Sequence, residues 1–181
     1  MKKFIAKLLY ICSDWMYIIY TFFSRSGHQM KVLFICTGNT CRSPMAEAYV
    51  RSRLDAMALW ETEVASAGIC ACDGARASAG AAAVIRSVGG DLSRFRSSTL
   101  TLSQIYDADY VICMGASHRR AAMQIAPDCA GKILMLLPDG DVPDPYGGNE
   151  DEYREVFEVM RPGLDAWVAR IAGLEKNKNT K

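Results

Sequence analysis

The feature that most constrains the fold is a strand, a short loop and the start of a helix in direct succession. The apolar run Val32–Ile35 is followed by a cysteine and an arginine that bracket five residues, and a Ser-Pro pair then opens a helical pattern. A loop this short can curl so that successive backbone N–H groups point at one anion. Gly38 and Asn39 tolerate the positive φ that such a loop needs. The sequence therefore predicts an anion-binding turn at the carboxyl end of a strand.

The residues at the two ends of this loop suggest phosphate chemistry. Arg42 supplies a planar two-pronged donor that fits phosphate oxygens, and the helix that follows aims its positive end at the same point. We expect Cys36 to be a thiolate in these surroundings. Ser43 either donates its hydroxyl to the thiolate or caps the helix, and both roles stay open. A small buried hydrophobe is the alternative for Cys36.

From residue 30 onward, strand-like and helical segments alternate. We expect strands at 31–36, 62–66, 110–114 and 132–136, and helices at 44–59, 78–88, 100–105, 116–125 and 150–172. This order predicts an α/β fold with a small four-stranded parallel sheet and helices on both faces, of the flavodoxin-like type. Ligands of such sheets bind beyond the carboxyl ends of the strands, where the Cys36 loop lies. Pro162 is expected to kink or split the last helix.

Two motifs carry a resemblance to a known family. Residues Cys36–Glu47, CTGNTCRSPMAE, resemble the signature of the low-molecular-weight protein tyrosine phosphatases, and Thr40 resembles the protein-arginine phosphatase branch. Asp144–Gly148, DPYGG, is similar to the family's acid loop, and the resemblance extends from about Lys31 to Leu174. It implies the phosphotyrosine protein phosphatase I type of fold. It also implies a cysteine-dependent phosphatase that acts on phosphoarginine or phosphotyrosine in proteins through a phosphocysteine intermediate.

The resemblance gives each site residue a role. Cys36 is the expected nucleophile, Arg42 stabilises the transferred phosphoryl group, and Asp144 is the expected general acid. On spacing alone, Asp139 and Asp141 compete with Asp144. No metal or other cofactor is implied, and the absence of a Cys-x2-Cys pair argues against zinc. Contacts to the substrate are expected from Thr37, Gly38, Asn39, Thr40, Cys41, Ser43 and Tyr146.

Three of these residues bear on substrate choice and regulation. Tyrosine-selective relatives usually carry a bulkier aliphatic residue at the position of Thr40, whereas a threonine hydroxyl can meet a guanidinium, so phosphoarginine is slightly favoured. The arginine type has phenylalanine where Tyr146 stands, which makes the pattern mixed. Tyr146 is expected to wall the pocket, with a surface loop aromatic as the alternative. Cys41 either forms a reversible disulfide with Cys36 or packs within the loop.

One position departs from the family pattern. Relatives generally place a histidine where Phe95 stands, and that histidine supports the anion loop by contacting the residue that matches Asn39. Phe95 cannot form this hydrogen bond. We therefore expect Asn39 to use another partner or the loop to be less rigid. His118 is a lone histidine on a helix and is expected to be solvated rather than a substitute.

Two rival functions from other classes remain. A thiol-linked arsenate reductase could share the scaffold, but it needs resolving cysteines close together near the third strand, and Cys113 and Cys129 are too far apart along the chain. A non-catalytic phosphoprotein-binding module could keep the anion loop. The presence of all three of Cys36, Arg42 and Asp144 argues against that module.

Composition limits the partners and the compartment. A net charge of +1 gives no electrostatic case for nucleic acid or for an anionic membrane. Seven cysteines form no regular disulfide framework, which fits a reducing compartment. We expect a cytoplasmic monomer whose partners are phosphorylated proteins.

The N-terminal residues 1–29 differ from the rest of the chain. The apolar run 4–23 is long enough to span a membrane, but Asp14 makes insertion marginal, and no small-residue cleavage site follows it. Either this extension is a weak membrane or partner anchor, or translation starts at Met30, and the later start is slightly favoured. Residues 30–174 are expected to form the phosphatase domain and residues 175–181 a frayed polar tail.

Overall fold

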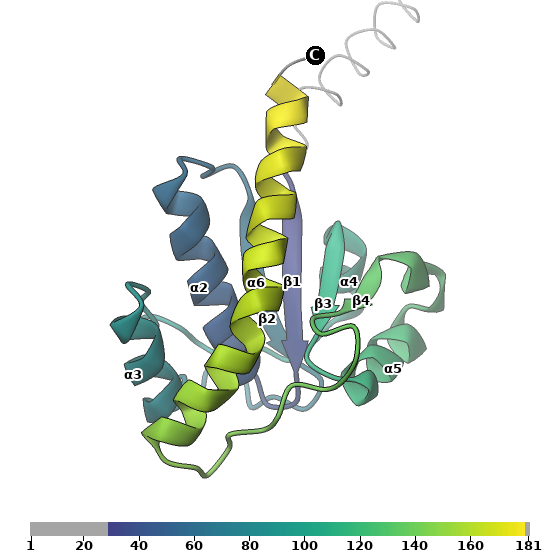
Figure 1. Cartoon of the computed structure of the whole chain (residues 1–181). Helices are drawn as coiled ribbons and strands as arrows, with labels where there is room; N and C mark the ends of the chain where they lie inside the picture. Colours follow the sequence, from purple (N-terminus) through teal and green to yellow (C-terminus); the bar gives the residue numbers. More distant parts are fainter. Residues whose placement is uncertain (1–28, 180–181) are drawn as a thin grey trace, which may run out of the picture.

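The computed structural model describes residues 29–179, and its centre is a parallel sheet (Figure 1). The strands are β1 (Lys31–Cys36), β2 (Glu63–Gly68), β3 (Tyr110–Cys113) and β4 (Ile133–Met135). They pair in the order β2-β1-β3-β4, and all three pairings are parallel. The predicted α/β fold with four parallel strands is confirmed. The chain winds to one side of β1 and then to the other, so the end of β1 lies at the switch point where ligands of such folds bind.

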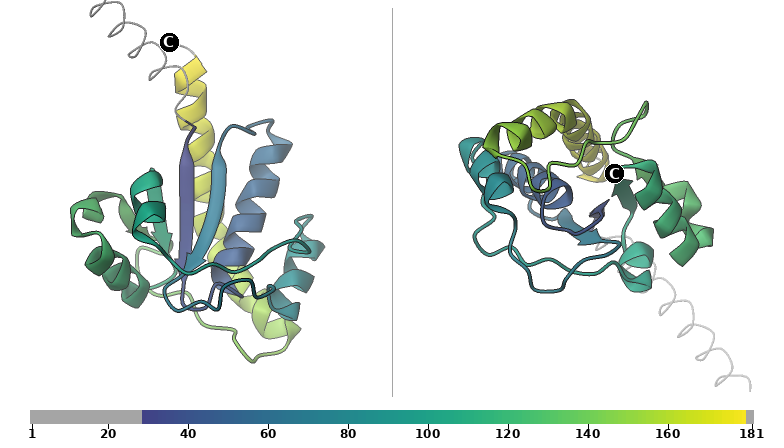
Figure 2. Two further views of the ribbon diagram at one scale, coloured as in Figure 1. Left: turned by 180° about the vertical axis from the view of Figure 1, so that it is seen from behind. Right: turned by 90° about the horizontal axis from the view of Figure 1, so that it is seen from below.

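Helices cover both faces of this sheet. One layer holds α2 (Arg42–Ala56), α3 (Ala79–Ser87) and α6 (Glu150–Asn179), and the other holds α4 (Leu102–Asp107), α5 (Ala116–Ile125) and the 3-10 helix η1 (Pro127–Lys132). Figure 2 shows the two layers from behind and from below. The two layers shield the sheet from water on both sides, so its strands can be almost wholly apolar.

The strand β1 joins the two apolar cores. Val32 and Phe34 belong to the core beneath α2 and α6, whereas Leu33 and Ile35 belong to the core beneath α4 and α5, as the alternation of side chains along a strand requires. None of these four side chains is more than 3% exposed. Burial of each such side chain stabilises the fold by about 1.5–3 kcal/mol. The loop after Cys36 therefore starts from one of the best-anchored segments of the protein.

The last helix differs most from the sequence expectation. α6 runs to Asn179, past the expected end at 172, and so includes most of the segment expected to be a polar tail. Glu175 in that segment is buried. Pro162 lies inside α6 without splitting it, and Figure 1 shows the helix changing direction along its length. The helix continues through Pro162 because residues on either side, Met160 and Leu164, are fully buried in the core.

Most other elements differ from the expected ranges by one to three residues at their ends, such as β2 at 63–68 instead of 62–66 and α4 at 102–107 instead of 100–105. α2 begins at Arg42 rather than at 44, and β4 is shorter than expected because η1 occupies the residues before it. The predicted anchor at residues 4–23 lies outside the described residues, as does the rest of the extension up to residue 28. Within residues 29–179, no helix is both long enough and apolar enough to cross a membrane.

Candidate active site

The loop between β1 and α2 forms hydrogen bonds with neighbouring segments along its outer side. Backbone carbonyls of the loop accept hydrogen bonds from segments that surround it: Ile69 N to Cys36 O at 3.0 Å, Cys70 N to Thr37 O at 2.9 Å, and Ser78 N to Thr40 O at 2.9 Å. Because these carbonyls point outward, the loop's N–H groups are left to face its interior. Asn39 adopts a φ of 52°, which bends the chain back on itself.

A glycine at the end of β2 permits this close approach. A Cβ atom on Gly68 would lie 2.6 Å from Thr37 O and 2.9 Å from Asn39 N, so any side chain there would displace the loop. The helix α2 then starts at Arg42 after Cys41, and no side chain of the described residues caps it. Ser43 therefore does not cap the helix, and the first N–H groups of α2 add their positive partial charges to the loop.

Asn39 is the centre of a hydrogen-bond network behind the loop. Its two amide hydrogens go to Ser43 Oγ at 3.0 Å and Ser66 Oγ at 2.8 Å, and its Oδ1 accepts the backbone N–H of Ser98 at 2.8 Å. Asn39 is fully buried. The structure thus resolves the question raised by Phe95: two serine hydroxyls and one backbone amide support Asn39 in place of a histidine.

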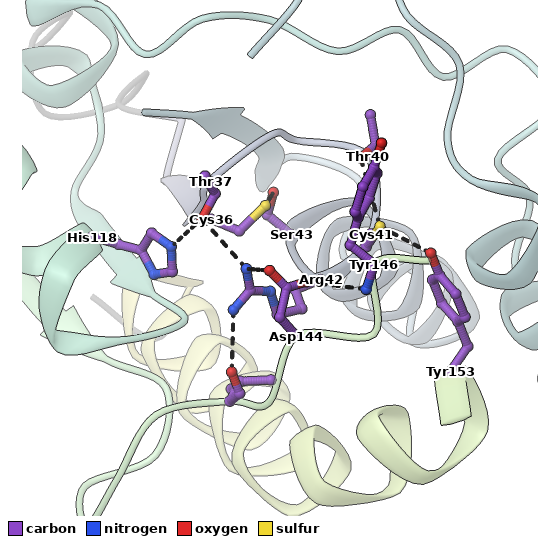
Figure 3. Close-up of polar contacts among 11 residues, drawn as sticks. Cys36, Thr37, Thr40, Cys41, Arg42, Ser43, His118, Asp144, Tyr146 and Tyr153 are labelled. Atoms are coloured by element: carbon purple, nitrogen blue, oxygen red, sulfur yellow. Dashed lines mark hydrogen bonds and ion pairs between the residues drawn. The ribbon is translucent and has the colours of Figure 1, made fainter. Parts of the chain in front are cut away.

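In this network two serine hydroxyls accept from Asn39 and keep their own hydrogens for a second partner. Ser43 Oγ accepts from Asn39, so its own hydrogen is free to point at Cys36 Sγ, 3.0 Å away (Figure 3). In the same way Ser66 accepts from Asn39 and donates to a carboxylate oxygen of Glu47. Of the two roles that the sequence left open for Ser43, the contact with the sulfur is the one formed. A hydroxyl at this position can donate a hydrogen bond to the sulfur.

Arg42 lies almost completely inside the site, with 7% of its surface exposed. Its Nη1 donates to Val142 O at 3.2 Å, and its Nη2 donates to Asp144 Oδ2 at 2.8 Å and to Thr37 Oγ1 at 3.4 Å. Its Nε is buried and has no partner within the described part of the chain. A buried guanidinium with an unused donor is well suited to an oxyanion that enters the loop.

The loop after β4 brings Asp144 to this guanidinium. Val142 anchors that loop, because it is buried and its N–H donates to Met114 O at 2.8 Å. Asp141 binds the backbone N–H of Ala116 at 2.7 Å and so holds the start of α5. Asp144 instead reaches Arg42, with half of its side chain exposed. Of the acidic residues that compete on spacing, Asp144 is the one that contacts Arg42 at the end of the anion loop.

The remaining predicted contacts lie around the rim. Tyr146 is 79% exposed, as either expectation for it allows, and its N–H contacts Asp144 Oδ1 at 3.3 Å. Thr40 is half-buried. Cys41 Sγ lies 3.2 Å from the hydroxyl of Tyr153 on α6, and burial followed by this hydrogen bond raises the pKa of Tyr153 to about 12. Cys41 is buried and packs in the loop beside this hydroxyl, and its disulfide with Cys36 stays a prediction.

The expectation that His118 is solvated is wrong. The ring is buried on α5, and Nε2 lies 2.9 Å from Thr37 Oγ1 (Figure 3). Burial, and then the nearby charge of Arg42, lowers the pKa of His118, with Asp141 and Asp144 acting more weakly in the other direction. The strand order could have predicted this contact. Because β3 neighbours β1, the first turn of α5 must lie beside the Cys36 loop.

A sulfur, a ring of amide hydrogens, a guanidinium and a carboxyl group thus meet at one point. Comparison with known proteins agrees with this chemistry. Residues 31–179 match the family described as low molecular weight phosphotyrosine protein phosphatase, and the chain belongs to that family. It is 34% identical over 145 residues to a probable low molecular weight protein-tyrosine-phosphatase, EpsP, of Ralstonia solanacearum, covering 79% of this chain and 97% of the relative.

A relative named as a protein-arginine-phosphatase has nearly the same sequence identity to this chain. The protein-arginine-phosphatase of Geobacillus stearothermophilus is 35% identical over 147 residues, covering 78% of this chain and 93% of the relative. Among solved structures, a YwlE arginine phosphatase mutant with a phosphorylated active site serine superimposes with a TM-score of 0.74 at 30% identity, covering 79% of this chain and 96% of that one. The protein is thus a cysteine-dependent, low-molecular-weight protein phosphatase. These relatives favour that function over arsenate reduction or simple phosphoprotein binding.

Proposed function

We propose that this phosphatase removes phosphoryl groups from arginine side chains of proteins, with Cys36 as nucleophile, Arg42 as the cation that follows the phosphoryl charge, and Asp144 as acid and base. The observation that carries the assignment of these roles is the pair of contacts at the two ends of the loop. Cys36 Sγ faces the Ser43 hydroxyl at 3.0 Å, and Arg42 faces Asp144 at 2.8 Å. Together they place the proposed nucleophile and the proposed cation at the two ends of one anion loop.

The first step is attack of the Cys36 sulfur on phosphorus. Inward N–H groups of the loop, together with Arg42, offset the repulsion between the two anions and stabilise the charge on the transferred oxygens. The phosphoryl group competes with Asp144 for the Arg42 guanidinium. Asp144 can then give its proton to the departing nitrogen or oxygen of the substrate.

The second step releases phosphate from the enzyme. Asp144, now a carboxylate, takes a proton from a water molecule that attacks phosphorus of the phosphocysteine. The sulfur leaves as a thiolate, and the hydroxyl of Ser43 stabilises it. The same carboxyl group therefore serves as acid and then as base, which its half-exposed position allows because water can reach it.

Thr40 is the residue on which the choice of phosphoarginine rests. Overall similarity does not decide the matter, since the tyrosine-type and arginine-type relatives are 34% and 35% identical. Thr40 is half-buried beside Cys41 and keeps a hydroxyl and a small volume next to the entry of the site. A guanidinium can donate to that hydroxyl, whereas a phenyl ring gains more from an aliphatic side chain.

Parallel kinetics test the substrate assignment. We would measure kcat/KM on matched phosphoarginine and phosphotyrosine peptides for wild type, Thr40→Val and Thr40→Ile, with Cys36→Ser as the blank. Thr40→Val removes the hydroxyl at nearly constant volume, and Thr40→Ile also adds bulk. The preference for the phosphoarginine peptide should be smaller in Thr40→Val and should change to a preference for the phosphotyrosine peptide in Thr40→Ile. Equal losses on both peptides would remove Thr40 from substrate selection.

We further infer a reducing, cytoplasmic setting and a monomeric enzyme. A thiolate nucleophile needs reduced surroundings, and all six cysteines within the described residues are free thiols. Every group of the proposed site comes from one chain. A division of the chain between residues 1–29 and the phosphatase domain remains part of this proposal.

A further inference from the structure

The buried histidine on α5 is joined to the anion loop through a single hydroxyl. His118 Nε2 contacts Thr37 Oγ1 at 2.9 Å, and the same oxygen accepts from Arg42 Nη2 at 3.4 Å. His118 is only 3% exposed, so its ring has little freedom to turn away. Figure 3 shows the three side chains in a row, with the hydroxyl of Thr37 between the ring and the guanidinium. The row links a helix on one face of the sheet to the residue that would bind the phosphoryl group.

Donor and acceptor chemistry determines which of these hydrogen bonds has a fixed direction. Arg42 can only donate hydrogen bonds, so Thr37 Oγ1 must accept from it. The hydroxyl oxygen stays in place to accept whether the neutral ring receives the Thr37 hydrogen or donates its own. Nδ1 of His118 is buried and has no partner within residues 29–179, so the contact with Thr37 is the one hydrogen bond that the ring forms with this part of the chain.

We propose that His118 is a positioning residue for Arg42: it fixes the hydroxyl of Thr37, which in turn holds the guanidinium in the anion loop. This inference rests on the proposed role of Arg42 in phosphoryl transfer. Within residues 29–179 three groups accept hydrogen bonds from the guanidinium, and one of them, Asp144, must leave during turnover to transfer its proton. Only the contacts with Val142 O and Thr37 then remain. Removal of the contact with Thr37 should therefore affect the position of Arg42 during phosphoryl transfer.

The charged groups that face the ring are consistent with a neutral positioning role. Arg42 from the anion loop disfavours a second positive charge, and Asp141 and Asp144 from the acid loop offset this only in part. A glutamine can bring a polar atom to the position of Nε2 without taking up a proton. It should therefore keep the function of His118 and remove any dependence on its titration.

A double-mutant cycle tests the proposal. We would measure kcat/KM on p-nitrophenyl phosphate for His118→Leu, Thr37→Val and the double variant, with His118→Gln as the rescue. Arg120→Gln removes an exposed charge from the same helix and is the matched control. One hydrogen bond that positions a reacting group is worth about tenfold. His118→Leu and Thr37→Val should each lower kcat/KM by about tenfold, and the double variant should lose no more than either alone. His118→Gln should recover most of the activity that His118→Leu loses. Arg120→Gln should match wild type.

Several results would overturn the proposal. Multiplying losses in the double variant would show that the two residues act separately, and a folded His118→Gln as poor as His118→Leu would show that shape alone matters. If His118→Leu does not fold, His118→Phe, which keeps a ring but has no polar atom, takes its place in the cycle and is judged by the same criterion. Wild type that turns over no more than Cys36→Ser would instead reject the proposed function, which keeps the two failures distinct.

Discussion

Replacing Asn39 by alanine should damage stability and activity together, because this side chain supports both the loop and the nucleophile. Three hydrogen bonds would be lost, to Ser43, Ser66 and the backbone of Ser98. At about 1 kcal/mol each they amount to about 3 kcal/mol. Alanine at a φ of 52° adds about 1 kcal/mol of backbone strain. The free energy of unfolding should therefore fall by about 4 kcal/mol.

Glycine at the same position separates the two contributions. Asn39→Gly loses the same three hydrogen bonds but adopts a positive φ without strain. It should be more stable than Asn39→Ala by about 1 kcal/mol, an unusual order because glycine ordinarily destabilises. Urea unfolding of both variants, followed by circular dichroism, gives the free energies directly. Equal stability of the two, or a loss below about 1 kcal/mol in Asn39→Ala, would contradict the network described here.

Activity should fall in both variants to the same extent. Without Asn39, nothing in the network fixes the Ser43 hydroxyl toward Cys36. We expect kcat/KM on p-nitrophenyl phosphate to drop by about tenfold or more, the value of one hydrogen bond to a charged group. These activities would be measured without urea and at a temperature far below the midpoint of thermal unfolding, which excludes a contribution from unfolded protein. Normal activity in Asn39→Gly would show that the serine contact is not needed.

Two further predictions concern the acid loop and pH. Asp144→Asn should lower kcat by about 10²–10⁴ on peptides with poor leaving groups and far less on p-nitrophenyl phosphate, measured side by side; equal losses would exclude Asp144 as the acid. Its stability should change by less than about 1 kcal/mol, because Asp144 is half exposed. Since the folded-state pKa of His118 is lowered, the unfolded chain binds more protons, and stability should fall as pH drops below about 6.5. His118→Gln should lack this component in urea unfolding at several pH values, and parallel curves would contradict it.

The sequence predicted the central unit of the fold well, for a clear physical reason. The apolar run of β1 is continuous because both faces of the sheet are covered, and such a run is typical of a buried parallel strand. The helix at Ala116–Ile125 was predicted to the residue because a glycine and a proline flank it. Cys36, Arg42 and Asp144 could be grouped because two motifs in the expected order belong to one family.

Long-range contacts could not be read from the sequence in the same way. The partners of Asn39 come from β2 and from the segment before α4, and no local pattern connects Ser66 or Ser98 with the loop. His118 was misjudged because a single histidine on a helix carries no periodic signal, and its burial depends on how α5 meets the β1 loop. The end of α6 was missed because burial of Glu175 comes from tertiary packing, not from local propensity.

The most direct test of the account is detection of the phosphoryl group on Cys36. Wild type and Asp144→Asn would be mixed with p-nitrophenyl phosphate, quenched in denaturant during turnover and digested, and the mass of the peptide that carries Cys36 would be measured. We expect a phosphoryl group on that cysteine in both, with more in Asp144→Asn because hydrolysis of the intermediate slows. Continued turnover with no phosphorylated Cys36 in either protein would contradict nucleophilic catalysis by this sulfur.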